Sequence, residues 1–103
     1  MLQLMVLYPQ PADVHQFEAD YAKHTELLHD KMGIPVTVKP YTVTKFLHGP
    51  AGPAPYYQLF TMPFDSPEAL DAAMASEGMQ EVAADANRIS TGSPIIVLIG
   101  NTQ

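Results

Sequence analysis

Two short apolar runs, one near each end of the chain, constrain its fold most strongly. Residues 2–8 and 95–99 are apolar at both odd and even positions, apart from Gln3 in the first run. Within the first run, Leu4 and Val6 would point to one side of a strand, and Met5 and Leu7 to the other. Strands of this kind have apolar side chains on both faces, so the sheet that contains them needs a cover on each side.

A long amphipathic helix is predicted between these runs, from Asp13 to about Met32. Asp13 is followed three residues later by Gln16, which is the spacing of a capping box. Gly33 and Pro35 are typical of a helix end. Apolar or aromatic residues recur every three or four positions and would share one face: Val14, Phe17, Tyr21, His24, Leu28 and Met32.

The middle of the chain predicts two strands, a loop and a divided helix. Residues 36–47 and 56–62 are rich in strand-forming residues, and Pro40 favours an edge position or a bulge for the first of them. The proline-rich residues 49–55 form the loop between them. Ser66-Pro67-Glu68 is a strong helix start. Gly78 interrupts this helix, and Ser76 is placed to cap a second piece.

The predicted order is therefore β-α-β-β-α-β, within one domain of residues 1–103. This order predicts a ferredoxin-like α+β fold, with a four-stranded antiparallel sheet and two helices on one face. The first and third strands are expected to lie side by side and parallel. Tyr57, Leu59 and Met5 would lie on the second face, and a second copy of the chain is the simplest cover for it. A homodimer is therefore predicted.

Composition excludes several classes of function. The net charge is −6, with four Lys and one Arg. The chain therefore lacks the basic surface that binds nucleic acids or anionic membranes. No segment approaches the roughly 20 apolar residues of a membrane span. Cysteine is absent, which excludes disulfides and thiolate catalysis. We expect a cytoplasmic protein without a cofactor. No metal site is predicted, because His15, His24 and His29 lack the spacing of helical ligands, and His15 and His29 are expected to face solvent.

Several stretches, in order, resemble one known family. They are Val6-Leu7-Tyr8-Pro9 with Asp13 and Phe17, then Tyr21-Ala-Lys-His24-Thr-Glu-Leu27, and Glu77-Gly78-Met79-Gln80 through Ala83-Ala84-Asp85 and Asn87. Through them the chain resembles the EthD-like proteins of the dimeric α+β barrel superfamily, over nearly its whole length. It departs from the pattern at Glu26, where relatives usually have Pro, and at Arg88, where they tend to have an aromatic residue.

The resemblance implies a homodimer whose two sheets pack face to face, with a cavity in each subunit between sheet and helices. Founding members of the family look like accessory proteins for the breakdown of an ether fuel additive. Relatives on this scaffold include polyketide cyclases, dehydratases, lactone isomerases and cofactor-free monooxygenases. A shared scaffold does not determine chemistry.

His24 is the first candidate catalytic residue, because an imidazole on the apolar face of a helix can act as a general base or acid near neutral pH. Asp20, one turn earlier, is placed to orient it. Tyr56 is the candidate donor to a carbonyl or enolate oxygen. Asp85 is the third candidate, with a pKa that burial would raise. A purely structural role stays open for each of them. His24 and Tyr56 would then be core residues, and Asp85 would cap a turn or pair with Arg88.

Tyr21, Gln58 and Phe60 are the predicted substrate-binding residues, since Gln58 and Phe60 share a strand face with Tyr56. The sequence thus favours a small-molecule-binding protein, with a cofactor-free cyclase, isomerase or dehydratase of an apolar or aromatic carbonyl compound as one hypothesis. The alternative is a non-catalytic accessory protein that holds an apolar ligand in a catabolic or oxygenase pathway. A haem-handling relative is a third hypothesis, for which His24 is the available ligand.

Overall fold

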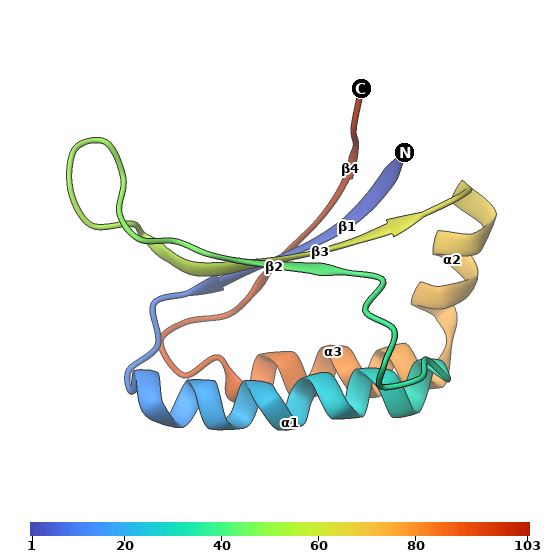
Figure 1. The fold of residues 1–103 in the computed structure, drawn as a ribbon, viewed down its shortest axis with the longest axis horizontal. Helices are drawn as coiled ribbons and strands as arrows, with labels where there is room; N and C mark the ends of the chain where they lie inside the picture. The colour runs from blue at the N-terminus through green and yellow to red at the C-terminus, as the bar shows by residue number, and fades with distance from the viewer.

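Four strands and three helices follow one another in the computed structural model, which describes residues 1–103 (Figure 1). The strands are β1 (Leu2–Pro9), β2 (Thr42–Lys45), β3 (Tyr56–Phe64) and β4 (Ile96–Asn101). The helices are α1 (Val14–Met32), α2 (Pro67–Ala75) and α3 (Glu77–Ile89). The predicted element order is confirmed, including the division of the second helical region into α2 and α3. None of these helices has the length and apolar character needed to cross a lipid bilayer.

The strands form one antiparallel sheet in the order β2-β3-β1-β4. β1 pairs with β3 on one side and with β4 on the other, so the predicted central place of the first run is confirmed. The first and third strands are neighbours as predicted, but the expectation that they are parallel is wrong. The α1 crossover makes β2 parallel to β1, and the β2–β3 hairpin then reverses the chain, so β3 enters between them in the opposite direction.

The helix boundaries follow the capping residues that the sequence indicates. The Asp13 side chain accepts a hydrogen bond from the Gln16 amide, and Gly33 ends α1 in the left-handed conformation with φ 65°. The hydroxyl groups of Ser66 and Ser76 accept hydrogen bonds from the third residue beyond each of them. These are local contacts, which is why the sequence predicts them well.

The predicted strand at residues 36–47 is much shorter in the structure, where only Thr42–Lys45 pair with β3. The preceding segment turns around His29 instead. The His29 ring donates from Nδ1 to the carbonyl groups of Ile34 and Pro35, and Nε2 accepts from the Tyr41 hydroxyl at 2.9 Å. His29 is therefore buried, and the expectation that it faces solvent is wrong, whereas His15 is exposed. The edge position that Pro40 favours is confirmed for β2.

The hydrophobic core lies between the sheet and the helices, which all cover the same face (Figure 1). Its most completely buried side chains come from β1, α1 and α3: Tyr8, Phe17 and Ile89. Two polar side chains, His24 and Gln58, are buried with them. Because a buried polar group is costly unless it is paired, each of these two side chains is expected to have a hydrogen-bond partner.

The opposite face of the sheet carries apolar side chains and no helix (Figure 1). Leu7 of β1 pairs with Leu59 of β3 and with Ile96 of β4, and Met5 pairs with Leu98. These side chains point away from the helices, because they alternate with the buried residues of the same strands. Leu98 is 50% exposed, although its strand was predicted to be covered on both faces. One chain therefore leaves an apolar sheet face uncovered, and we name it the outer face.

Gly92 holds the loop before β4 against the end of β1. A Cβ atom at this position would lie 2.1 Å from the Gln10 carbonyl oxygen, which is rigid backbone. We expect Gly92→Ala to lower the free energy of unfolding by about 1–3 kcal/mol, because the loop must move to relieve the overlap. Urea unfolding followed by circular dichroism measures this change.

Gly49→Ala is the matched control for Gly92→Ala. Its Cβ would make an ordinary 3.5 Å contact with the Gly52 carbonyl oxygen, and Gly49 does not have positive φ. We expect a change within about 0.5 kcal/mol. Equal losses of stability in the two variants would contradict the assigned role of Gly92.

Candidate functional site

A histidine–aspartate pair joins the two long helices beneath the sheet. His24 lies on the buried face of α1, and Asp85 lies on α3 beside the buried residues Val82 and Ala86. Packing of these two apolar faces brings His24 Nδ1 to 2.8 Å from Asp85 Oδ2. The two side chains are 7% and 18% exposed. Two of the predicted catalytic residues are thus in direct contact.

Arg88 holds the other oxygen of the Asp85 carboxylate. Its Nε and a terminal guanidinium nitrogen lie 2.9 Å and 2.8 Å from Asp85 Oδ1. Burial alone would raise the pKa of Asp85, but hydrogen bonds from His24 and Arg88 outweigh it and lower that pKa. The expected raised pKa of Asp85 is therefore wrong, and its pairing with Arg88 is confirmed. Asp85 is a carboxylate at neutral pH.

The carboxylate determines which nitrogen of His24 carries the proton. Because an ionised carboxylate can only accept, Nδ1–H donates to Asp85 and Nε2 keeps its lone pair. Burial lowers the pKa of His24, and Asp85 offsets only part of this effect. The imidazole is therefore neutral and able to accept a proton at Nε2. Asp20 does not orient it as expected, because Asp20 instead accepts a hydrogen bond from Gln16.

Tyr8 is the residue on the free side of the imidazole. Its hydroxyl group lies 3.5 Å from His24 Nε2, which is a long contact that leaves the lone pair weakly engaged. The ring packs edge-on against Phe17 and Tyr21, with centroids 5.5 Å apart in both pairs. Burial raises the pKa of Tyr8 far above its usual range, so the hydroxyl stays protonated. Tyr8 and Leu4 both occupy even positions of β1 and therefore point to the same face of the sheet. This alternation is the signal by which the sequence could have placed Tyr8 on the helix side.

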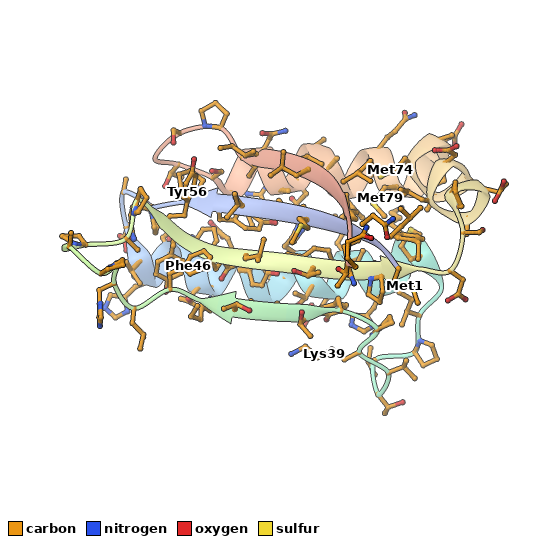
Figure 2. All side chains as sticks on the ribbon, turned by 90° about the horizontal axis from the view of Figure 1, so that it is seen from above. Met1, Lys39, Phe46, Tyr56, Met74 and Met79 are labelled. Carbon is orange, nitrogen blue, oxygen red and sulfur yellow. The ribbon has the colours of Figure 1, made fainter.

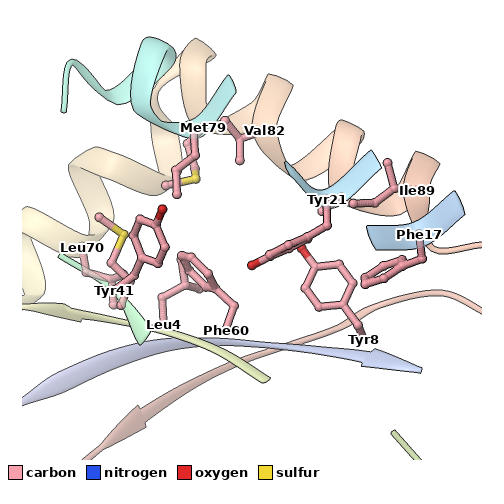
Figure 3. Close-up of a cluster of buried hydrophobic side chains, with 13 residues drawn as sticks. Leu4, Tyr8, Phe17, Tyr21, Tyr41, Phe60, Leu70, Met79, Val82 and Ile89 are labelled. Atoms are coloured by element: carbon pink, nitrogen blue, oxygen red, sulfur yellow. The ribbon is translucent and has the colours of Figure 1, made fainter. Parts of the chain in front are cut away.

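Beside His24 and Tyr8 lies an apolar cavity of about 60 Å³. Leu4 and Phe60 of the sheet face Met79 and Val82 of α3 across this space (Figure 3). Twelve of its thirteen lining residues are hydrophobic, and His24 is the exception. Its most exposed lining residues lie on α3 and β4, so the cavity opens between these elements. A cavity of this size exceeds by several times the space that one water molecule needs.

The structure separates the other predicted site residues. Phe60 lines the cavity, whereas Tyr21 and Gln58 do not. Tyr21 lines a groove toward β2, although its ring lies 5.7 Å from that of His24, and the Gln58 side chain accepts a hydrogen bond from Lys45. Tyr56 lies at the start of β3, at the opposite end of the sheet from Met74 and Met79, which line the cavity (Figure 2).

A β-bulge explains why Tyr56 is not beside His24. Tyr8 pairs with Gln58 and Pro9 pairs with Tyr56, so β3 contains one extra residue, Tyr57, at this point. The bulge breaks the strict alternation on which the prediction for Tyr56 rested. Tyr57 consequently contacts α1, with its ring 5.4 Å from that of Phe17. The expectation that Tyr57 lies on the outer face is therefore wrong.

The strand order and the helices on one face define a ferredoxin-like α+β protein with a small apolar cavity between its layers. The family model of the EthD domain matches residues 9–93, so the chain belongs to the EthD domain family. No curated protein matches it in sequence.

Solved structures of similar fold cover nearly the whole chain. An ethyl tert-butyl ether d (EthD) family protein from Bacillus halodurans C-125 is 27% identical, with a TM-score of 0.85 over 100% of this chain and 99% of that one. A dimeric ferredoxin-like protein of unknown function from Jannaschia sp. CCS1 is 12% identical, with a TM-score of 0.70 over 99% and 100%. An antibiotic biosynthesis monooxygenase is 16% identical, with a TM-score of 0.60 over 100% and 99%.

The contact between His24 and Asp85 predicts how the pKa of His24 responds to substitution. The Asp85 carboxylate raises this pKa against the effect of burial. Asp85→Asn removes the negative charge and leaves the nearby Arg88 cation, so the pKa of His24 should fall below its value in the unchanged protein. An NMR pH titration of the His24 ring protons measures this shift.

Glu81→Gln is the control for Asp85→Asn. It removes a carboxylate of the same helix that pairs with Lys31 and not with His24. This substitution should leave the His24 titration unchanged. A His24 pKa that stays constant or rises in Asp85→Asn would contradict the assigned ion pair.

Proposed function

We propose that this protein binds a small apolar carbonyl compound in the cavity and catalyses its cyclisation, isomerisation or dehydration by acid–base chemistry without a cofactor. The observation that carries the proposal is the alignment of Asp85, His24 and Tyr8, which ends at the cavity. A carboxylate that orients an imidazole is a recurrent arrangement for a general base.

His24 is the base of the proposed reaction. Its neutral Nε2 removes a proton from a carbon next to the substrate carbonyl, and the electron pair of the broken C–H bond passes to the carbonyl oxygen. The resulting imidazolium is stabilised by Asp85, whose pKa keeps it ionised. Arg88 holds the carboxylate in place during this step.

Tyr8 takes the role that the sequence predicted for Tyr56. Once Nε2 is protonated it no longer accepts a hydrogen bond, so the Tyr8 hydroxyl is free to donate to the negatively charged oxygen of the enolate. His24 then returns the proton, either to another carbon or to a departing hydroxyl group. In an apolar cavity these two donors act with little competition from water.

The cavity lining supports the proposed class of substrate. With hydrophobic residues at twelve of thirteen positions, it favours a compound that is apolar around a single oxygen-bearing group. A charged group on the substrate would be buried in this cavity without a partner, which is costly. The compound must also be small, because the cavity measures about 60 Å³.

The alternative function is non-catalytic binding of an apolar ligand on behalf of a partner enzyme. The nearly complete apolar lining supports this alternative as well. The Bacillus halodurans relative is an ethyl tert-butyl ether d (EthD) family protein, and this family name would connect the alternative function with ether breakdown. The two functions differ in whether His24 Nε2 moves a proton.

Exchange of the α-protons of cyclohexanone in D₂O distinguishes the two functions, because exchange requires a base and no further chemistry. We expect the protein to accelerate the exchange, and His24→Gln to lower the catalysed rate by about 100-fold or more. Tyr8→Phe should lower it by about 10-fold or more through loss of the enolate donor. Proton NMR follows the loss of the α-proton signal.

His15→Gln is the control, because His15 lies on the same helix with an exposed side chain. This variant should retain the full exchange rate. Binding of cyclohexanone with equal exchange rates in His24→Gln and the unchanged protein would reject catalysis and favour the alternative function.

We also propose that two copies of the chain pair through their outer faces. The exposed apolar side chains of β4 and the half-buried Met5, Leu7 and Leu59 beside them support this assembly, since each copy would shield the other. The relative from Jannaschia sp. CCS1 is described as dimeric. Pairing through this face would leave the helices on the outside of the assembly.

Leu98→Lys tests the proposed homodimer, because Leu98 lies on the outer face and is 50% exposed in one chain. We expect the unchanged protein to sediment as a dimer and this variant to be mostly monomer, since a lysine would be buried in the apolar interface. Gln80→Lys makes the same change in charge on the exposed side of α3 and should stay dimeric. A monomeric unchanged protein would refute the proposed assembly.

A further inference from the structure

We propose that a groove between α1 and β2 is a second binding site, for a small monocarboxylate with a flat apolar body. This groove goes beyond the proposed function, because none of its lining residues lines the cavity beside His24. Its main lining side chains come from α1, β2 and the segment before β2: Glu18, Tyr21, Thr25, Lys39, Tyr41 and Lys45.

The charge of the groove is opposite to that of the whole protein. Two of the five Lys and Arg residues, Lys39 and Lys45, lie here in a chain of net charge −6. Glu18 is the only acidic lining residue, so the groove carries two positive charges and one negative charge. Lys39 forms no ion pair and lies at the β2 edge of the sheet (Figure 2). The net charge of +1 suits one carboxylate and disfavours a multiply charged anion.

The ammonium group of Lys45 is held in place before any ligand arrives. It lies 4.9 Å from the ring centroid of Tyr57, 5.4 Å from that of Tyr21 and 5.9 Å from that of Phe17. It also donates to Glu18 and to the side-chain oxygen of Gln58. A fixed cation costs less conformational entropy on binding than a mobile surface lysine does.

Two buried polar groups beside this cation have no hydrogen-bond partner. Lys45 can only donate, so it holds Gln58 with Oε1 toward the ammonium, and the Gln58 amide nitrogen is left unpaired. The Tyr21 hydroxyl also makes no hydrogen bond of normal geometry, although it lies near the Gln58 side chain, and it points to the side of Phe60 and Tyr41 (Figure 3). Gln58 is fully buried, and Tyr21 is 7% exposed.

Unpaired buried donors are rare in native proteins, because each one loses its bonds to water without replacement. Burial raises the pKa of Tyr21, so its hydroxyl keeps its proton and can donate. A carboxylate in the groove would supply an acceptor for the Tyr21 hydroxyl beside the two cations, Lys39 and Lys45. The rings of Tyr21 and Tyr41 supply apolar walls for a flat body.

Isothermal titration with benzoate tests this site on the unchanged protein. We expect saturable binding, and binding of the neutral analogue benzamide weaker by about 10-fold or more, because charge-assisted hydrogen bonds are lost. Lys45→Met keeps most of the side-chain packing and should weaken benzoate binding by about 10-fold or more. Lys39→Met and Tyr21→Phe should each weaken it by a smaller factor.

Tyr21→Phe also has a readout without ligand. The substitution removes an unpaired buried hydroxyl, so the midpoint of thermal unfolding should stay constant or rise while benzoate affinity falls. That combination separates loss of a binding group from loss of structure. Should Lys45→Met fail to fold, Lys39→Met and the comparison of benzoate with benzamide on the unchanged protein test the same claim.

His24→Gln separates this site from the cavity, and it should leave benzoate affinity unchanged. The proposal is overturned by absence of saturable benzoate binding, or by equal affinity for benzoate and benzamide. It is also overturned if His24→Gln abolishes benzoate binding while Lys39→Met leaves it intact, because benzoate would then occupy the cavity.

Discussion

The packing of α1 beside α3 under one face of the sheet is the interaction on which the rest of the structure depends. It buries the apolar faces of both helices and places His24 against Asp85 at 2.8 Å. The two helices cover β1 and β3 more fully than β4, so a cavity remains that opens between α3 and β4. The same packing buries the imidazole deeply enough to keep it neutral. Stability and the proposed chemistry therefore share one contact.

The helix α1 serves two separate polar environments. His24 faces α3 and the apolar cavity, whereas Tyr21, less than one turn earlier, lines the groove toward β2. In the first environment Asp85 is hydrogen-bonded to His24 Nδ1, and His24 Nε2 makes only a long contact with the Tyr8 hydroxyl. In the second, Lys45 and Tyr21 line a groove that is open to solvent, and the buried Gln58 side chain lies beside Lys45. The two sites differ in charge, so they would select different compounds.

Membership of the EthD domain family agrees with the scaffold but does not decide the chemistry. The residues that carry the proposed reaction come from three elements of this chain, β1, α1 and α3. Arg88 holds the carboxylate that orients the proposed base.

The sequence by itself determined the elements, their order, their caps and the two-sided apolar character of β1, because periodicity, capping and chain reversal are local properties. It also indicated His24 and Phe60, which line the cavity, and Asp85, which contacts His24. It could not indicate the partners of His24, since Asp85 is 61 residues away and Tyr8 is 16 residues away along the chain. The bulge at Tyr57 moved Tyr56 out of the site, and the burial of His29 followed from carbonyl groups that only the folded turn supplies. Tertiary structure decided these points, because each depends on how separate elements shift against one another when they pack.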